Sequence, residues 1–247
     1  MFNKTDLTVA ICGGGNLAHA SIATIGHLHP GFKITMFSTR PEIWANKIVG
    51  ETKGSAWESK GELTGTIHKC SANPAEVIPN ADVIIICSPA HTKIDVLQKI
   101  KPFIKTSAFI GTIFGQGGFD LQCRYVLGED IQKKALTIFS SQYVPFICKA
   151  HDYGKRCTII GPKKDLYVTS YPVEKVQDAC KLMTLLYGIP SLVVPNFLSL
   201  TLTPSNQIIH PGRVYSFFKN WDMKTPFDKS KMPLLYEEID DDSANEI

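Results

Sequence analysis

A glycine-rich turn near the start of the chain has the spacing that most directly suggests chemistry. The apolar run 7–12 leads into this turn, an apolar helical pattern follows it, and the turn itself has the form G-x-G-x-x-A. In this arrangement the first glycine permits a tight turn, the second lets the backbone approach a pyrophosphate, and the small last residue lets the helix pack on the strand. The pattern predicts a dinucleotide-binding turn at a helix N-terminus, with an ordinary glycine turn as the alternative. The predicted cofactor-binding residues here are Gly13, Gly14, Gly15, Asn16, Leu17 and Ala18.

The residues after the second predicted strand bear on which dinucleotide would bind. A site selective for NAD usually has an acidic residue here for the ribose hydroxyls, whereas the 2′-phosphate of NADP calls for arginine and hydroxyl groups. The chain has Ser38, Thr39 and Arg40 at this place. Arg40 could pair with the phosphate while Ser38 or Thr39 donates to it, which favours NADP. Arg40 could instead cap the loop or stack on adenine, so NAD and NADP both remain open.

A histidine and an amide stand together near the C-terminus. Thr203 has the features of a helix N-cap and Pro204 those of the first helical residue, which places Asn206 and His210 one turn apart on the same face. Such a pair can orient a carbonyl, or the amide can hold the tautomer of the imidazole, so both residues are candidates for acid–base catalysis. Pro211 would loosen the helix beside the histidine. A packing or capping role for His210 is the alternative.

Strand-like and helix-like segments alternate through the first three quarters of the chain, which is typical of a parallel sheet covered by helices. A continuous Val/Ile run within 80–89 is typical of a strand buried on both faces. The predicted strands are 7–12, 33–37, 80–89, 108–114 and 191–194, and the predicted helices are 17–29 and 173–187. We therefore expect an α/β fold, a Rossmann-type doubly wound sheet (1–195) followed by the beginning of an α-helical second domain (196–247).

Ligands of such sheets lie beyond the carboxyl ends of the strands. We expect four loops to converge on one crevice there: Gly13–Gly15, Ser38–Arg40, Ser88–His91 and Gly115–Gly118. Ser88 and Pro89 are accordingly predicted to contact the cofactor. The polar, glycine-bearing segment 52–70 is expected to form a hairpin excursion outside the core or, as the favoured alternative, a plain surface insertion.

Composition excludes several classes of protein. The chain has 247 residues, of which 44% are apolar and 20% are charged, as in an ordinary soluble globular protein. Its net charge of +3 is too small to indicate nucleic-acid binding. The sequence has neither a signal peptide nor an apolar run of the ~20 residues that cross a bilayer. Its seven scattered cysteines predict reduced thiols in the cytoplasm and no metal site.

Several separated motifs resemble those of the opine dehydrogenases, most closely the invertebrate octopine dehydrogenases. They are the turn Cys12–His19, the blocks Gln116–Arg124 and Pro145–Lys149, the pair Asn206 with His210-Pro211, and Pro233–Tyr236. The resemblance extends over essentially the whole chain. It implies a two-domain enzyme that condenses the amine of an L-amino acid with a 2-oxo acid, typically pyruvate, and reduces the imine with the hydride of NAD(P)H.

The resemblance also implies roles for individual residues. His210 would polarise the oxo-acid carbonyl and act as general acid and base, supported by Asn206. Gln116 would face the 2-oxo acid. Tyr143 and Cys148 would line the amino-acid pocket, although a free cysteine is often simply buried.

Family members are considerably longer than this chain, and the missing part carries an arginine for the substrate carboxylate and an acid that pairs with the histidine. Arg213 is a candidate substitute for that arginine. The resemblance implies a monomer that uses NADH, but we expect this chain to expose apolar residues and so to be poorly soluble or self-associating. These residues are Ile208, Ile209, Phe217, Phe218 and Trp221.

Two other functions fit part of the sequence. A reductase of the glycerol-3-phosphate or ketopantoate type shares the glycine turn followed by asparagine, but it would need a catalytic lysine on a second-domain helix. A dinucleotide-binding fragment without catalysis, such as a redox sensor or interaction module, would need only the first domain. Turnover with pyruvate and an amino acid would distinguish an opine dehydrogenase from the non-catalytic fragment. The class of substrate would distinguish it from the reductase.

Overall fold

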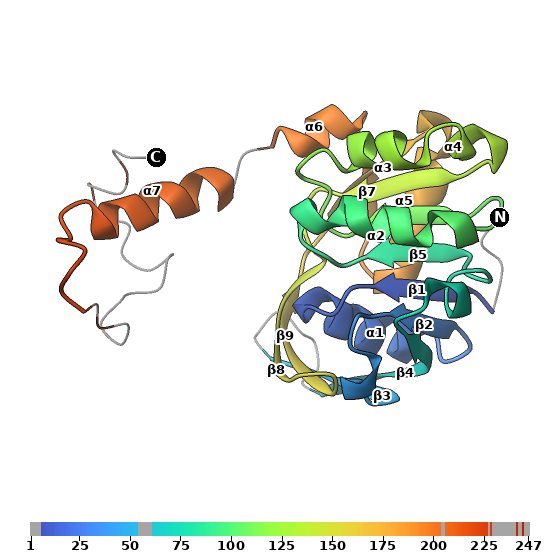
Figure 1. The fold of residues 1–247 in the computed structure, drawn as a ribbon, viewed down its shortest axis with the longest axis horizontal. Coiled ribbons are helices and arrows are strands. Elements are labelled where there is room, and N and C mark those ends of the chain that lie inside the picture. Colours follow the sequence, from blue (N-terminus) through green and yellow to red (C-terminus); the bar gives the residue numbers. More distant parts are fainter. Residues whose placement is uncertain are drawn as a thin grey trace. The chain divides into compact units, whose positions relative to one another are not determined.

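The computed structural model describes residues 6–53, 61–203, 206–226, 228, 241 and 244. Contacts between Cα atoms divide the chain into two compact units, Met1–Thr201 and Leu202–Ile247. The first unit contains a large sheet with helices and the second contains one long helix (Figure 1).

The described part of the first unit forms one mixed sheet in the order β11-β10-β7-β6-β5-β1-β2-β4-β3-β9-β8. Strands β2, β1, β5, β6 and β7 are parallel neighbours, whereas the pairs β3–β4, β7–β10 and β8–β9 are antiparallel. The strands are β1 Thr8–Cys12, β2 Lys33–Phe37, β3 Lys47–Thr52, β4 Glu62–Ser71, β5 Val83–Ile86, β6 Phe109–Thr112, β7 Thr137–Ser141, β8 Phe146–Asp152, β9 Arg156–Pro162, β10 Leu166–Tyr171 and β11 Ser191–Val193.

Helices cover both faces of this sheet and create two core clusters. Along β1, Val9 and Ile11 join the cluster that includes residues of α1 and α5, while Ala10 and Cys12 join the cluster that includes residues of α2 and α3. This alternation is why the strand is apolar throughout. The helices are α1 Asn16–Leu28, α2 Lys93–Ile100, α3 Phe119–Leu127, α4 Asp130–Lys133, α5 Val176–Tyr187, α6 Phe197–Thr201 and α7 Asn206–Phe218.

The structure confirms the predicted Rossmann-type α/β fold. The chain leaves β1 toward β2 on one side and later returns to place β5 on the other side of β1. The sheet order therefore reverses between β1 and β5, which is the point where ligands bind in doubly wound sheets. The antiparallel hairpin of β8 and β9 at the far edge was not predicted from the sequence.

The hairpin predicted for 52–70 is confirmed in its described part, because β4 pairs with β3 in antiparallel fashion, but its placement outside the core is wrong. Residues 62–71 form β4, which lies between β2 and β3 inside the sheet and buries Ile67. A Cβ atom on Gly65 would overlap the carbonyl of Ile22 in α1, so the glycine is there to let the helix backbone lie against the strand. Residues 54–60 lie outside the described part of the chain.

The second unit contains α7, which has Pro211 inside it, as the sequence predicts. The predicted N-cap partner Pro204 lies outside the described residues. Of the residues expected to be exposed, Ile208 and Trp221 are exposed at 43% and 37% of their surfaces. The other three, Ile209, Phe217 and Phe218, are half-buried.

Candidate functional site

A pocket of about 390 Å³ opens at the point where the sheet order reverses. Three of the four predicted loops line it, together with one face of α2 and a residue from the turn between β8 and β9. The lining residues are Gly13, Gly14, Gly15, Phe37, Ser38, Thr39, Arg40, Ser88, Thr92, Asp95, Val96, Lys99 and Tyr153.

The glycine turn is tied to the strands on either side of β1. The N–H of Gly13 donates to the carbonyl oxygen of Phe37 at 3.1 Å. Gly13 has a φ of +123°, and a Cβ atom there would lie 2.9 Å from the carbonyl oxygen of Cys87 at the end of β5. Both the backbone conformation and this close approach require glycine. Gly15 differs, because its φ is −81° and the space that a Cβ atom would occupy has no heavy atom of the described chain within 4 Å.

The start of α1 offers an environment suited to an anion. Gly15 is the N-cap residue, and the first turn of the helix contains no acidic side chain. The first N–H groups of a helix lack intrahelical partners and carry partial positive charge. Ala18 is fully buried in the core, as its predicted packing role requires. The Asn16 side chain is otherwise engaged, because its Oδ1 accepts a hydrogen bond from the N–H of Ala150 in β8 at 3.0 Å.

The loop after β2 presents Arg40 to the pocket. Ser38 is buried, and its Oγ accepts a hydrogen bond from the N–H of Arg40 at 3.2 Å. The Arg40 guanidinium carbon lies 5.3 Å from the centre of the Tyr153 ring, within cation–π range. The arginine therefore stands at the pocket with an aromatic neighbour, which the sequence pattern did not indicate.

The loop after β5 contributes Ser88 but, among the described residues, Pro89 is not part of the lining. Pro89 is exposed and precedes a short 3-10 turn that leads into α2. Sequence reasoning missed the face of α2 that completes this side, formed by Thr92, Asp95, Val96 and Lys99. Their spacing of three and four residues after the Ser-Pro loop is the signal that could have found them.

The fourth predicted loop, Gly115–Gly118, does not line this pocket, which corrects the expectation that all four loops converge. Gln116 is 2% exposed, and its Nε2 donates to the carbonyl oxygen of Gln142 at 3.5 Å. Buried Lys93 donates from Nζ to the carbonyl oxygen of Phe114 at 2.9 Å, directly before the loop. The loop is thus held inward against its neighbours.

Tyr143 and Cys148 are the two other predicted substrate residues of the first unit. Tyr143 lies between β7 and β8, and Cys148 lies in β8. The N–H of Gly115 donates to the carbonyl oxygen of Ser141 at 2.9 Å, so the loop with Gln116 adjoins the segment that leads to Tyr143. Tyr143 is half-buried, and Lys163 Nζ lies 6.0 Å from the centre of its ring. Cys148 is half-buried in β8 against the core that contains residues of α1 and α5, and burial raises the pKa of its thiol to about 12.

The predicted catalytic pair lies in the second unit. Asn206 and His210 are both in α7, four residues apart as one helical turn requires. His210 is half-buried. Arg213 is 1% exposed and its guanidinium carbon lies 4.0 Å from the centre of the Phe217 ring.

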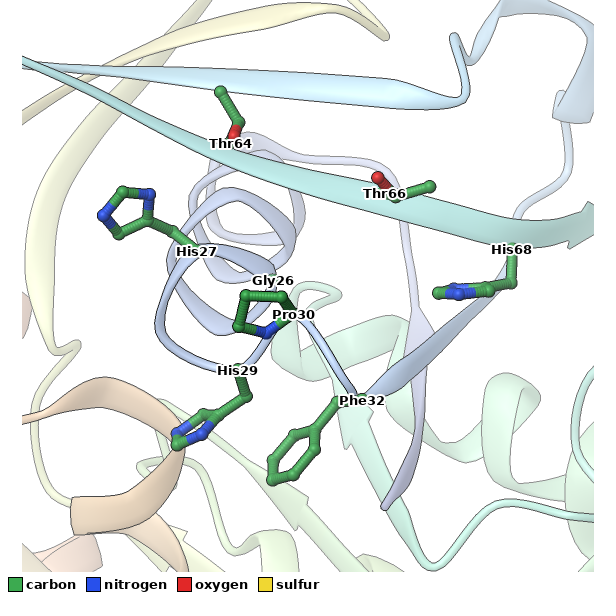
Figure 2. A pocket seen from close by; sticks show the side chains of 8 residues that line it. All are labelled: Gly26, His27, His29, Pro30, Phe32, Thr64, Thr66 and His68. Carbon is green, nitrogen blue, oxygen red and sulfur yellow. The ribbon is translucent and has the colours of Figure 1, made fainter. Parts of the chain in front are cut away.

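A second hollow, of about 360 Å³, lies at the C-terminal end of α1 (Figure 2). Its three imidazoles, of His27, His29 and His68, stand apart from one another around the opening. His29 donates from Nε2 to the carbonyl oxygen of Leu185 at 2.6 Å, and His68 accepts at Nδ1 from the N–H of Ile34 at 3.2 Å. Two of the three rings are therefore committed to structural hydrogen bonds, and the hollow does not bring groups together for chemistry.

No group of three or more His, Cys, Asp or Glu side chains is arranged to hold a metal ion within the described residues. None of the helices in this part of the chain is both long enough and apolar enough to span a membrane.

Fold and pocket together define a Rossmann-type α/β protein with an open glycine turn at the point of strand-order reversal. No protein-family model matches the chain. The chain is similar to the octopine dehydrogenase of Pecten maximus, with 28% identity over 96% of the chain, and to the opine dehydrogenase of Haliotis discus hannai, with 28% identity over 96% of the chain. The chain spans 60% of the length of each of these relatives.

Solved structures share this fold. A structure of octopine dehydrogenase in complex with NADH and agmatine superposes with a TM-score of 0.79 at 24% identity, covering 97% of this chain and 60% of that one. Yersinopine dehydrogenase bound to NADP⁺ gives a TM-score of 0.68 at 18% identity over 85% of this chain and 53% of that one. A 2-dehydropantoate 2-reductase from Geobacter metallireducens gives 0.62 at 10% identity over 85% of this chain and 64% of its own. At these identities the structures establish the fold, and the curated relatives named above are an octopine dehydrogenase and an opine dehydrogenase.

Proposed function

We propose that this chain is the dinucleotide-binding part of an NAD(P)H-dependent opine dehydrogenase, which condenses an L-amino acid with pyruvate or a related 2-oxo acid and reduces the product. The observation that carries the proposal is the open space above Gly15 at a helix start without acidic residues. A pyrophosphate needs this combination of close backbone approach and N–H groups. The relatives of the chain, which are opine dehydrogenases, support the choice of reaction.

The residues of the pocket fit the two ends of such a cofactor. Gly13, Gly14 and Gly15 with the start of α1 would hold the pyrophosphate, and Ser38 with Arg40 would hold the adenosine ribose. Ser88 and Pro89 would border the part that leads toward the nicotinamide. A bound reduced nicotinamide supplies the hydride for the reaction.

The chain's own residues would orient the substrates and move protons. We assign His210 the role of polarising the oxo-acid carbonyl and of general acid and base, with Asn206 supporting it on the same helix. Gln116 would face the 2-oxo acid, and Tyr143 with Cys148 would border the amino acid. The thiol of Cys148 would act by shape and polarity, because its raised pKa keeps it protonated at neutral pH.

The choice between NAD and NADP depends on Arg40. Its guanidinium and the buried Ser38 hydroxyl lie beside the expected ribose position, which suits a 2′-phosphate. We expect Arg40→Asp to shift the ratio of NADPH to NADH affinity toward NADH. An unchanged ratio would exclude the phosphate role of Arg40.

Cofactor binding is tested by replacing Gly15. Gly15→Ala adds a methyl group to an open site in an ordinary backbone conformation, so it should leave thermal stability unchanged. We expect it to weaken NADH and NADPH binding more than about tenfold, because the methyl group would keep the phosphate from the backbone. Gly61→Ala is the matched control, since the Cβ position of Gly61 is also open and the residue does not line the pocket. Equal affinities for both variants would contradict the proposal.

Catalysis is tested by following NADH and NADPH oxidation with pyruvate and a panel of L-amino acids. Oxidation that requires both substrates and is lost in His210→Ala supports an opine dehydrogenase. Tight cofactor binding without turnover supports a non-catalytic dinucleotide-binding protein instead. Oxidation with ketopantoate or dihydroxyacetone phosphate, and no need for an amine, supports the reductase alternative, whose fold is related.

We further propose that the protein acts in the cytoplasm on small molecules, without nucleic-acid or membrane partners. The exposed apolar residues Ile208, Val214 and Trp221 of the second unit support self-association of the 247-residue chain. Light scattering tests this part of the proposal, and a monodisperse monomer would contradict it.

A further inference from the structure

The turn between β8 and β9 reaches the glycine turn from more than 130 residues further along the chain. Gly154 lies in this turn with a φ of +79°, and a Cβ atom on it would overlap the carbonyl of Ile43. The carbonyl oxygen of Gly154 accepts from the N–H of Ala45 at 2.9 Å. These contacts, together with that of Ala150 to Asn16, fix the turn close to the N-terminus of α1.

Tyr153 of this turn stands directly beside the predicted phosphate position. Its hydroxyl oxygen would lie 2.6 Å from a Cβ atom built on Gly14. Its ring faces the Arg40 guanidinium at 5.3 Å, and 43% of its surface is exposed, partly into the pocket. Within the described ranges the hydroxyl has no protein hydrogen-bond partner, so it is able to donate to a ligand.

His19 holds the turn in this place. Because the N–H of Gly154 is a donor, Nε2 of His19 must accept it, at 2.7 Å. Nδ1 then carries the hydrogen and donates to the carbonyl oxygen of Gly15 at 2.9 Å. The ring is fully buried, with the rings of Trp44 and Tyr153 at 4.3 and 5.0 Å between centres. One neutral imidazole thus connects the N-cap of α1 to the residue after Tyr153.

We propose that Tyr153 is a further cofactor-contacting residue, whose hydroxyl donates a hydrogen bond to the pyrophosphate and whose ring directs Arg40 toward the adenosine end. His19 is the positioning residue that keeps Tyr153 there. This inference rests on the proposed dinucleotide binding. The cofactor would then contact both the glycine turn and the turn between β8 and β9, which is distant in sequence.

The hydroxyl is tested by titrating the full chain with NADH, NADPH and ADP-ribose, the last of which contains the pyrophosphate but no nicotinamide. Tyr153→Phe should weaken all three about tenfold, because one hydrogen bond to a charged group is lost. Tyr167→Phe is the matched control, since Tyr167 of β10 is also 43% exposed and does not line the pocket. Wild-type affinity in Tyr153→Phe would overturn the inference. Failure of the wild-type chain to bind any of the three would instead overturn the proposed function.

The positioning role of His19 is tested by a double-mutant cycle. His19→Phe keeps an aromatic ring beside Trp44 but loses both hydrogen bonds, and we expect it to weaken ADP-ribose binding. The double variant combines His19→Phe with Tyr153→Phe. If His19 acts through Tyr153, this double variant should bind ADP-ribose no more weakly than whichever single variant binds it more weakly. Additive losses would overturn the positioning role. If His19→Phe does not fold, His19→Leu, which also lacks both hydrogen-bonding groups, takes its place in the same cycle.

Discussion

Two glycine-containing loops follow parallel strands at the same edge of the sheet, and they are built in opposite ways. Gly13–Gly15 after β1 is open on its outer side, and nothing in the described chain stands over Gly15. Gly115–Gly118 after β6 is packed, because a Cβ atom on Gly115 would overlap the Ser140 hydroxyl and lie 2.7 Å from Leu200. The first loop leaves its backbone accessible at Gly15, whereas the second is packed against Ser140 and Leu200.

The side chains that hold the two loops in place also differ in their chemistry. A neutral imidazole, His19, donates to the carbonyl of Gly15 and accepts from the turn that carries Tyr153. An amine, Lys93, donates to the carbonyl of Phe114 and lies 5.1 Å from the centre of the Phe119 ring, so it contacts the residues on both sides of Gly115–Gly118. Protonation of His19 would remove its Nε2 acceptor, whereas loss of a proton from Lys93 would remove its charge, so the groups that hold the two loops respond to pH in different ranges.

The largest loss of stability should come from replacing the glycine of the first loop whose backbone conformation disfavours any other residue. Gly13→Ala puts a Cβ atom at a φ of +123° and 2.9 Å from the backbone oxygen of Cys87, where neither side can yield easily. We expect a loss of about 3–4 kcal/mol in the free energy of unfolding, measured by urea denaturation. Gly15→Ala in the same loop should lose almost none. Similar losses for the two variants would show that the loop is not open at Gly15.

The second effect concerns Lys93. Burial lowers the pKa of Lys93 from 10.5 to about 8, and the nearby Cys123 and Cys87 oppose this shift. Between these two values the unfolded chain binds more protons than the folded chain, so the contribution of Lys93 makes stability rise as the pH rises. The rise amounts to at most ~3 kcal/mol across this range.

Lys93→Met removes this contribution and supplies the comparison. The difference in unfolding free energy between wild type and Lys93→Met should move in favour of wild type from pH 8 to pH 10.5, as followed by chemical denaturation at a series of pH values. A difference that stays constant with pH would show that the amine is solvated. Lys133→Met serves as a control, because the Lys133 side chain is 69% exposed.

A smaller effect is expected from overfilling the second loop. Gly115→Ala should cost about 2 kcal/mol of stability, because the new methyl group meets Ser140 and Leu200 in a packed site. Thermal denaturation with Gly15→Ala as the partner variant measures the contrast between a packed and an open loop. Rescue by Ser140→Ala in the double variant would identify the hydroxyl as the obstacle, and a Gly115→Ala chain as stable as wild type would remove the contrast.

The sequence predicted the parts of this site that depend on local pattern. The strand, turn and helix at residues 7–29 and the Val/Ile strand β5 follow from neighbouring residues, and their positions agree with the structure. The place of β4 inside the sheet was missed because segment 52–70 is polar and contains glycines, whereas Gly65 is set by contact with Ile22 in α1. Tyr153 was missed for a related reason, since its place beside Gly14 is created by a hairpin distant in sequence. Lys93 looked like any lysine of an amphipathic helix, and only the packing of α2 and α3 buries it.

The smallest effect should come from His19, at the opposite end of the pH scale. Burial lowers the pKa of His19 from 6.5, and its hydrogen bond to Gly15 opposes the shift. Below pH 6.5 the unfolded chain therefore takes up a proton before the folded chain does, so stability falls with falling pH until the folded-state pKa is passed. Wild type should lose its stability advantage over His19→Phe as the pH falls below 6.5, which denaturation experiments at a series of pH values would measure. ADP-ribose affinity should fall in wild type alone, at the lower pH where the folded-state pKa of His19 is passed, because protonated Nε2 can no longer accept from Gly154. An affinity that does not change with pH would separate the imidazole from the Tyr153 turn.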